Sequence, residues 1–396
     1  MPIEYQTTTM EQADTVDLFA GPGGLDVAAR WLGRETYGLE WDADACQTRK
    51  AAGFNFGEHD VRSLGPRDFP AATMLTGGPP CQTFTVAGGG AGRRALDTVL
   101  KFIIAMAAGE RVQDDLARLD DERTGLVLEP LRWALEADEQ GRPYRTIVLE
   151  QVPAVLPVWE AIGRVLRDNL RYRVVTGVLH TEMYGVPQTR RRAVLIASLD
   201  GPRALPRPTH RIYRKSGLRP TDDCALPMWK TMAQALPDRP GPFKVVSNYG
   251  TGGDPKARGV RTSDQPSATV TGKVSRNKVE TEDGETNRFR DDEAGRLQSF
   301  PMDYPWEGGA IAQQIGNAVP PIFGLHVLSA ALGRQVTREE ADKVFALDWA
   351  EVSPAMTDRI PDVLADIRRR VRSGSTDTDS GYGTGIERDP QLAMFP

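Results

Sequence analysis

The chain has few of the residues that build covalent or metal-held scaffolds. Its 396 residues include only three cysteines, Cys46, Cys81 and Cys224, which are too few for a disulfide framework. It has four histidines and neither a CxxC nor an HExxH spacing, so no metal site is expected. These absences favour a reducing, cytoplasmic setting.

Long apolar runs are also missing. The longest, from Val99 to Ala108, is interrupted by Lys101 and is too short to cross a bilayer. The first residues, MPIEYQTTTMEQADTVD, lack the basic-then-apolar order of a signal peptide. We therefore expect neither a membrane anchor nor export.

A net positive charge, common in nucleic-acid-binding proteins, is absent, since the formal net charge is −5. The charge is instead segregated along the chain. Residues 185–219 hold nine Lys or Arg against Asp200 alone, whereas residues 1–60 hold eleven acids against four bases. Such a basic block is a candidate surface for phosphates, although it is about as often an ordinary solvated surface.

The composition, 40% hydrophobic and 26% charged, is that of a globular protein long enough for two or three domains. Short β-rich runs alternate with helical patterns over the first half, which predicts an α/β domain with a largely parallel sheet. An amphipathic crossover helix is expected around Trp159 to Leu170. The expected strands are residues 15–19, 36–39, 73–76, 146–149, 173–179 and 192–198. The last two are too close for a helical crossover, so they should pair antiparallel.

The chain changes character after Gly201. Ten prolines lie between Pro202 and Pro266, which predicts a separate, loop-rich domain. Helical periodicity resumes near Asp291 and again over residues 322–332, and the Thr337-x-x-Glu340 pattern predicts a capping box. Residues 373–385 form a Ser/Thr/Asp/Gly tract, which is typical of disorder.

A glycine-rich turn follows the first expected strand. Its sequence is Asp17-Leu18-Phe19-Ala20-Gly21-Pro22-Gly23-Gly24. Glycine lets the backbone approach a ligand, and an acid at the end of the next strand, here Glu40, suits ribose hydroxyls. A glycine turn alone is weak evidence, since tight turns need glycine anyway, and Trp41 alone is equally compatible with core packing. Together with Asp60 as a partner for an adenine amino group, these residues favour a nucleoside site.

Cys81 follows another expected strand in the run Gly77-Gly78-Pro79-Pro80-Cys81-Gln82. A lone cysteine is most often a small buried apolar residue. The paired glycines and prolines, however, impose a stiff backbone at a strand's carboxyl end, where open α/β sheets bind ligands. The glycine-rich residues 87–94 beyond it suit a loop that closes over a substrate. This context favours a reactive cysteine.

Six motifs occur along residues 14–333 in an order that resembles the cytosine-5 DNA methyltransferase family. They are residues 17–24, Pro79-Pro80-Cys81-Gln82, Glu150-Gln151-Val152, Gln188-Thr189-Arg190-Arg191-Arg192, Arg296-Leu297-Gln298-Ser299-Phe300-Pro301 and Gln314-Ile315-Gly316-Asn317-Ala318-Val319. The resemblance implies an α/β fold: a Rossmann-like class I S-adenosylmethionine-dependent methyltransferase domain. This domain would be doubly wound, with a mostly parallel sheet and one antiparallel strand, and joined to a small irregular target-recognition domain.

On the same resemblance, four regions are expected. Residues 1–203 form the first part of the catalytic domain, and residues 204–287 form the target-recognition domain. Residues 288–335 return to the catalytic domain and complete the donor site. Residues 336–396 form a C-terminal helical extension and a disordered tail.

The resemblance implies transfer of a methyl group from S-adenosylmethionine to C5 of cytosine in double-stranded DNA, at a specific short sequence. C5 is a poor nucleophile until a thiolate adds at C6, which is the implied role of Cys81. Glu150 resembles the acid that contacts N3 and the exocyclic amine, and Arg192 the arginine near the cytosine O2, with Arg190 supporting the same strand. Because the target atom is inaccessible in a stacked duplex, base flipping is also implied. No metal is required.

The resemblance also implies two sets of binding residues. The S-adenosylmethionine site comprises Asp17, Phe19, Ala20, Gly21, Gly23, Gly24, Leu25, Glu40, Trp41, Asp60, Val61, Pro80, Asn317 and Ala318. The DNA contacts are Gln82, Thr85, Arg93, Arg94 and Gln188. The expected partners are duplex DNA and, in a restriction–modification pair, a cognate restriction endonuclease. The protein itself is expected to be a monomer, encoded by a bacterium or a phage, that associates with the nucleoid when bound to DNA.

The chain departs from the family pattern in three places. The family's Glu-Asn-Val is Glu150-Gln151-Val152 here, residues 95–119 are extra, and the tail after Gly333 lies outside the resemblance. Two other functions stay open. One is methylation of cytosine in RNA, against which the length of the proline-rich domain argues. The other is a DNA-binding regulator that retains a donor pocket, against which the presence of Cys81, Glu150 and Arg192 argues.

Overall fold

The structure is a computed structural model of the 396-residue chain. It describes residues 8–80, 90–116, 118–119, 123–217, 219, 225–248, 259–354 and 360–372, with the backbone alone for residues 90–94 and 113. The expected tail therefore lies outside the described residues. None of the helices in these ranges is both long and apolar enough to cross a membrane.

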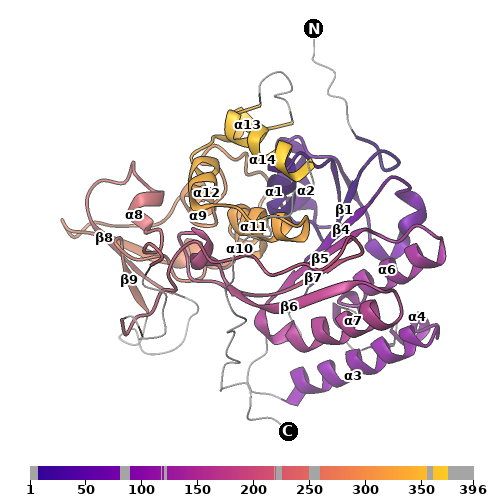
Figure 1. The fold of residues 1–396 in the computed structure, drawn as a ribbon. Helices are drawn as coiled ribbons and strands as arrows, with labels where there is room; N and C mark the ends of the chain where they lie inside the picture. The colour runs from indigo at the N-terminus through magenta and orange to yellow at the C-terminus, as the bar shows by residue number, and fades with distance from the viewer. Residues whose placement is uncertain are drawn as a thin grey trace.

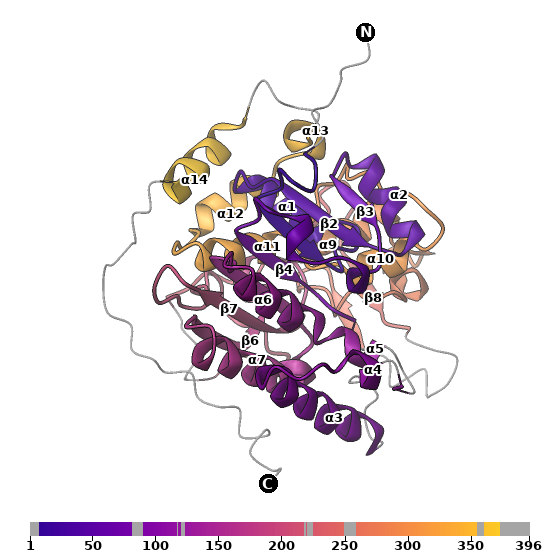
Figure 2. The ribbon, with the colours of Figure 1, turned by 90° about the vertical axis from the view of Figure 1, so that its right-hand side faces the viewer.

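A seven-stranded sheet forms the core of the main domain, in the order β3-β2-β1-β4-β5-β7-β6 (Figures 1 and 2). The strands are β1 (Thr15–Leu18), β2 (Thr36–Glu40), β3 (Phe56–Glu58), β4 (Met74–Gly77), β5 (Thr146–Gln151), β6 (Arg173–His180) and β7 (Arg191–Ser198). The first five run parallel, and β7 runs antiparallel to both β5 and β6. The predicted mostly parallel sheet with one antiparallel strand is confirmed. Only β3, which has three residues, was not predicted from the sequence.

Helices cover both faces of this sheet, as the doubly wound prediction requires. One face carries α1 (Gly24–Trp31) and α11 (Pro321–Ala331), and the other carries α3 (Gly90–Ala107), α6 (Glu129–Glu139) and α7 (Leu156–Asp168), which Figure 2 shows together. Helix α11 is buried along its whole length because nearly every side chain in it is apolar. The expected crossover is α7, whose Trp159, Ile162 and Leu166 are buried while Arg164 and Arg167 are exposed. The extra residues 95–119 form most of α3, which packs against α7.

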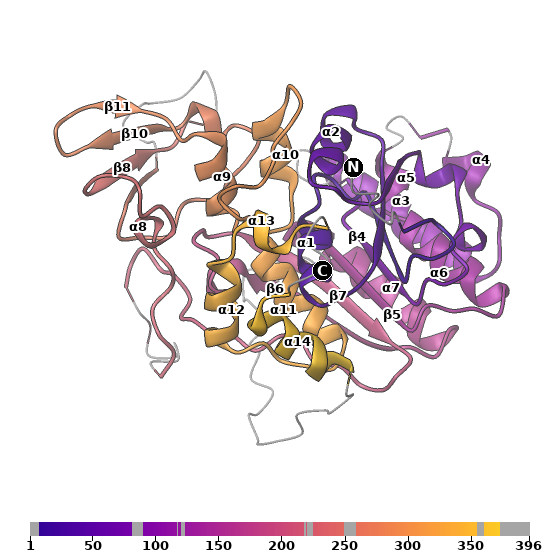
Figure 3. The same cartoon turned by 90° about the horizontal axis from the view of Figure 1, so that it is seen from above.

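The proline-rich segment contains more regular structure than the irregular domain expected there. Four strands form an antiparallel sheet in the order β11-β10-β8-β9, which lies to one side of the main sheet (Figures 1 and 3). The elements are α8 (Met232–Ala235), β8 (Phe243–Val246), β9 (Val260–Thr262), β10 (Lys278–Thr281) and β11 (Thr286–Asn287). Strands of two to four residues are too short for an alternation of apolar and polar side chains to be recognised. The prolines and glycines around them therefore led to the prediction of loops.

After this sheet the chain returns to the main domain. The returning helices are α9 (Asp291–Leu297), α10 (Ile311–Asn317) and α11, followed by α12 (Arg338–Phe345), α13 (Trp349–Val352) and α14 (Asp362–Arg372). The predicted capping box is confirmed, since Thr337 and Glu340 exchange side-chain-to-backbone hydrogen bonds of 2.8 and 3.2 Å. Helix α14 is held against α1 by Arg368, which donates to the carbonyls of Arg30 and Trp31.

Short elements complete the described structure. They are α2 (Ala43–Ala51), α4 (Gln113–Leu116), α5 (Arg123–Leu126), and the 3-10 helices η1 (Val61–Ser63), η2 (Pro66–Asp68), η4 (Pro153–Val155), η5 (Thr181–Tyr184) and η7 (Val274–Arg276).

Candidate active site

A cavity of about 400 Å³ opens where β1, β2, β4 and β5 end, at the carboxyl edge of the parallel strands. It is lined by thirteen of the fourteen residues predicted to bind the donor and by three of the four predicted to be catalytic, namely Glu150, Arg190 and Arg192. The fourth, Cys81, lies outside the described residues, although its neighbours Gly78 and Pro80 line the cavity. The structure therefore brings segments from the two ends of the sequence to one place.

Gly23 is the predicted donor residue that does not line the cavity. Its φ of +104° is the left-handed conformation that favours glycine, and a Cβ there would come within 2.7 Å of the Phe54 ring. Gly24 is also sterically required, because its Cβ would lie 2.1 Å from the Val319 carbonyl oxygen. These glycines allow the β1–α1 turn to pack directly against the segment that returns from α10.

Glu40 holds the same turn through its carboxylate. One oxygen accepts from the Gly21 N–H at 2.7 Å, and the other accepts from the N–H groups of Trp41 and Asp42 at 2.8 Å each. Trp41 lines the cavity with 55% of its surface exposed, which is unusual for a large apolar side chain. Asp60 lies on the same wall, where its hydrogen bonds with Arg62 lower the pKa of the carboxyl group. An acidic wall beside an exposed aromatic ring suits a cationic nucleoside.

A buried charge network under the turn was missed by the sequence analysis. Arg49 is fully buried and pairs with both carboxylate oxygens of Asp26 at 2.8 and 2.9 Å. The same guanidinium donates to the carbonyls of Ala20 and Gly21 at 3.4 and 3.3 Å. Burial and the nearby charge of Asp26 raise the pKa of Asp17 well above its usual range. No local sequence motif predicts this network, because its members come from β1, α1 and α2 and contact one another only in the folded chain.

Glu150 and Arg192 form an ion pair inside the cavity, on the neighbouring strands β5 and β7. The Arg192 Nε atom lies 2.5 Å from a Glu150 carboxylate oxygen, and the two side chains are only 12% and 7% exposed. Burial raises the pKa of Glu150, while the charges of Arg192 and Arg190 act in the opposite direction. A carboxyl group in this setting can hold a proton at a pH where an exposed one could not.

Arg190, which immediately precedes β7, connects this strand to two other parts of the fold. It is 3% exposed, and it donates to the carbonyl of Val270 at 2.8 Å and to that of Gly316 at 2.9 Å. The residue thereby joins β7 to the small domain and to α10, whose last residues line the cavity. Asn317 lines the cavity beside Ala318, and its side-chain oxygen accepts from Gln313 at 2.8 Å.

Gln151, which departs from the Glu-Asn-Val pattern of the resemblance, connects two segments of the structure. Its amide nitrogen donates to the Pro79 carbonyl at 2.6 Å, and its amide oxygen accepts from the Val152 N–H at 2.5 Å. The side chain therefore connects the end of β5 to the stiff segment that leads to Cys81. The extra methylene does not prevent the amide from orienting the neighbouring backbone.

The structure describes the side chain of only one of the five residues predicted to contact DNA, Gln188. Gln82 and Thr85 lie outside the described residues, as do the side chains of Arg93 and Arg94, whose backbone belongs to α3. The assignment of Gln188 needs correction. Its side chain is 0% exposed, with the amide nitrogen bound to the Leu297 carbonyl at 3.1 Å and to the Gln298 side chain, and the amide oxygen bound to the Val270 N–H. Because its amide is fully committed inside the protein, Gln188 joins the two domains instead of facing DNA.

The sequence is similar to those of known proteins. The model of the family described as C-5 cytosine-specific DNA methylase matches residues 13–104, which include the β1–α1 turn and the Pro79-Pro80-Cys81 segment. Type II methyltransferase M.NgoBI of Neisseria gonorrhoeae is 32% identical over 213 residues, which are 51% of this chain and 56% of that protein. Type II methyltransferase M1.HphI of Haemophilus parahaemolyticus is 27% identical over 359 residues, covering 80% of this chain and 86% of the relative.

Solved structures show the same fold. The Dnmt2 methyltransferase of S. pombe superposes with a TM-score of 0.51 at 15% identity, covering 79% of this chain and 96% of that one. At this identity the likeness establishes the architecture alone, and the expected Rossmann-like methyltransferase fold is confirmed.

Proposed function

We propose that the chain, which resembles the C-5 cytosine-specific DNA methylase family over residues 13–104, transfers a methyl group from S-adenosylmethionine to C5 of cytosine in double-stranded DNA. The observation that carries the proposal is the buried Glu150–Arg192 pair, which lies in the same cavity as the donor residues and directly beside the approach to Cys81. An acid and a cation at that point match what cytosine activation requires.

The cavity fits the donor. Gly24 lets the β1–α1 turn pack closely against Val319 at the cavity wall, Glu40 and Asp60 supply carboxylates, and Trp41 supplies an exposed aromatic face. When bound there, S-adenosylmethionine supplies an electrophilic methyl group. Carboxylates and an aromatic ring favour a cationic ligand over a neutral one.

The protein's own residues activate the cytosine. We expect the Cys81 thiolate to add to C6 of the base, so that the C6–S bond forms while electron density moves onto C5 and N3. Glu150, whose pKa is raised by burial, donates a hydrogen bond or a proton to N3 as this charge develops. Arg192 holds the Glu150 carboxyl in place through Nε, and we expect its Nη2 group to contact the cytosine O2 while Nη1 donates to the Arg191 carbonyl. After methylation, loss of the C5 proton expels Cys81 and restores the aromatic ring.

Because the reacting atoms of cytosine are inaccessible in a stacked duplex, the proposal includes flipping of the target nucleotide. Unstacking costs a few kcal/mol, which contacts with the flipped base must offset. The relatives named as Type II methyltransferases also support, as part of this proposal, a role beside a restriction endonuclease of the same sequence specificity.

A trapping experiment tests the proposal. A duplex carrying 5-fluorocytosine at the target cannot release the enzyme, because fluorine replaces the proton that must leave. We expect a covalent complex that forms only with S-adenosylmethionine and disappears in Cys81→Ala. The target sequence is first found by bisulfite sequencing of DNA from cells that express the protein.

Two outcomes would overturn the proposal. Adducts formed on RNA but not on duplex DNA would assign an RNA substrate. An absence of methylated cytosine in expressing cells, with DNA binding intact, would favour a regulator that has lost catalysis.

A further inference from the structure

A second cavity, of about 500 Å³, lies at the end of the sheet opposite the donor cavity. Four arginines line it together with Tyr172, Val174 and Pro202: Arg167, Arg171, Arg173 and Arg203. We name this cavity the arginine groove. The register of the sheet fixes its position, because Arg173 pairs with Ser198 on β7, and Ser198 pairs with Thr146 at the start of β5. The donor cavity, in contrast, opens at the other end of β5, beside Glu150.

The charge of the groove is uncompensated within the described parts of the chain. None of the seven lining residues is acidic, and none of the four arginines forms an ion pair there. The nearby Asp200 is already paired with Arg145. Arg203 uses Nε and one terminal nitrogen on the carbonyls of Ala331 and Pro202, which anchors the side chain without neutralising it.

The backbone holds one of these arginines in an unfavourable conformation. Arg171 has a φ of +63°, in the left-handed region where glycine is the usual residue, and the chain closes around it through a 2.9 Å bond from the Tyr172 N–H to the Leu166 carbonyl. The electrostatic preference of a helix end for cations explains part of the cluster, because α7 ends at Asp168. It does not explain Arg173 and Arg203, which come from β6 and from the segment after β7.

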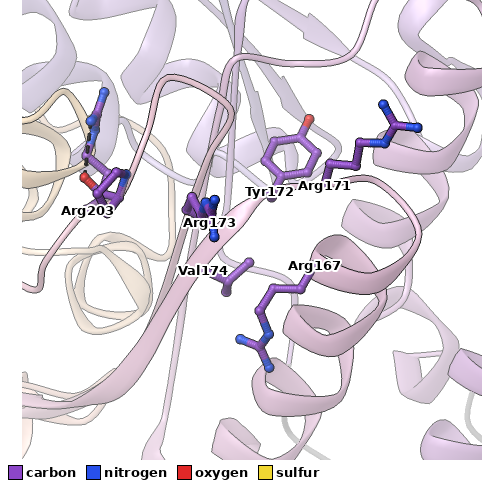
Figure 4. A pocket seen from close by; sticks show the side chains of 7 residues that line it. Arg167, Arg171, Tyr172, Arg173, Val174 and Arg203 are labelled. Atoms are coloured by element: carbon purple, nitrogen blue, oxygen red, sulfur yellow. Dashed lines mark hydrogen bonds between the residues drawn. The ribbon is translucent and has the colours of Figure 1, made fainter.

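The guanidinium groups are arranged for an extended ligand. Figure 4 shows them spread around the groove, with Arg167 and Arg171 pointing in different directions and not toward one common point. The segment that carries Arg203 continues along β6, where a Cβ on Gly177 would lie 2.7 Å from Leu205, and it leads to the exposed Arg207. A row of separated cations matches a chain of phosphates better than a single anion.

We propose that the arginine groove binds phosphate groups, and that their source is the backbone of a DNA segment separate from the one at the donor cavity. This inference rests on the proposed function, because it takes duplex DNA as the partner. Thr146 and Glu150 stand four residues apart on β5, so the groove is displaced by about 13 Å along the strands. DNA at the donor edge reaches the groove only if its flank bends around the sheet or a second duplex is present.

The test compares duplexes of two lengths, about 14 and about 50 base pairs, and measures binding as a function of salt. The groove variant is Arg167→Gln with Arg173→Gln, and its matched control is Arg67→Gln with Arg372→Gln, two exposed arginines on other elements. For the long duplex we expect the groove variant to lower the slope of log K against log salt by about 2, since each phosphate contact contributes about 0.9. The control variant and the short duplex should show no such change.

Arg171→Gly provides a second variant that removes a charge and at the same time relieves the left-handed strain, so loss of folding cannot explain its effect. We expect its slope on the long duplex to fall by about 1. Binding of inorganic pyrophosphate, followed by calorimetry, separates the two sources of phosphate.

The outcomes are distinct. If pyrophosphate binding is lost in the groove variant but the long-duplex slope is unchanged, the groove takes free phosphate compounds and the DNA source is wrong. If neither changes, the groove is not an anion site. In both cases, intact methyl transfer to a short duplex that carries the target would leave the proposed function standing. If the unmodified protein transferred no methyl group to that duplex, the proposed function itself would be contradicted.

Discussion

The two ends of the same sheet differ in how their polar groups are used. At the carboxyl end, the Glu40 carboxylate accepts three hydrogen bonds from backbone N–H groups, and Arg190 and Arg49 donate to backbone carbonyls. Gln151 connects the end of β5 to Pro79 through its side-chain amide. At the opposite end, arginines surround a groove without a single ion pair in the described structure. The first arrangement suits the small donor and the single base of the proposed reaction, whereas the second suits the phosphate chain proposed for the groove. Substitutions should therefore affect chemistry at one end and salt-dependent binding at the other.

The largest expected effect is that of Glu150→Gln. The amide keeps the shape of the side chain but cannot supply the proton that N3 needs, so we expect kcat to fall by about 10² to 10⁴ with donor binding unchanged. Steady-state methyl transfer to a short duplex measures this. Glu340→Gln is the matched control, because Glu340 is likewise paired with an arginine but lies in the C-terminal extension. Equal activity of the two variants would remove Glu150 from the mechanism.

Gly24→Ala tests the close packing of the β1–α1 turn against Val319, which shapes the donor cavity. The added methyl group would meet the Val319 carbonyl at 2.1 Å, and overpacking against a backbone atom costs about 1–3 kcal/mol. We expect weaker binding of S-adenosylmethionine, by roughly tenfold or more, and a lower melting temperature. Gly125→Ala is the control, since its nearest neighbours are at an ordinary 3.4 Å. Unchanged donor affinity in Gly24→Ala would show that the turn is not part of the donor site.

A pH effect on stability should arise from His326 and His210, which are both buried. Burial lowers the pKa of His326 to about 3 and that of His210 to about 4. The unfolded chain binds these protons below about pH 6.5, whereas the folded chain does not, so stability is complete above that pH and falls as the pH drops toward 4. At pH 5 each histidine costs about 2 kcal/mol. Urea unfolding at pH 7 and pH 5 measures the loss, which should shrink in His326→Leu.

Gln151→Ala should have a smaller effect at the donor end. It leaves the Pro79 carbonyl and the Val152 N–H without their present partner, and a lost hydrogen bond of this kind costs about 1 kcal/mol. We expect kcat to fall by about tenfold while the affinity for the donor is kept. Gln151→Asn, the shorter amide, should recover part of the rate. A full rate in Gln151→Ala would mean that the approach to Cys81 holds its shape unaided.

The smallest expected effect lies at the opposite end. Arg171→Gly places the preferred residue at a φ of +63° and should raise stability by about 0.5–1 kcal/mol. Thermal unfolding checks this, with methyl transfer on a short duplex as the control that should not change. A fall in stability would show that the arginine contributes packing that outweighs the strain.

Much of the fold and of the candidate site could be predicted from local patterns. Six of the seven strands of the main sheet, the crossover α7 and the capping box at Thr337 follow from periodicity and from side chains close in sequence. The small sheet could not be predicted, because strands of two to four residues carry too little alternation. Gln188 was misplaced for another reason: a polar residue beside a basic run looks exposed until the tertiary structure supplies partners for every atom of its amide.

The sequence by itself determined which chemistry is available, because the order and spacing of the Cys81, Glu150 and Arg192 motifs depend only on the chain. Tertiary structure decided which groups share a cavity. Arg190 reaches Gly316 across 126 residues, and Arg203 joins Arg167 and Arg173 only because β6 and β7 pair antiparallel. Contacts of this range are set by the packing of the sheet and helices. No local pattern in the sequence encodes these contacts. The hydrogen bonds around the donor cavity and the clustering of arginines in the arginine groove could therefore be recognised only in the folded chain.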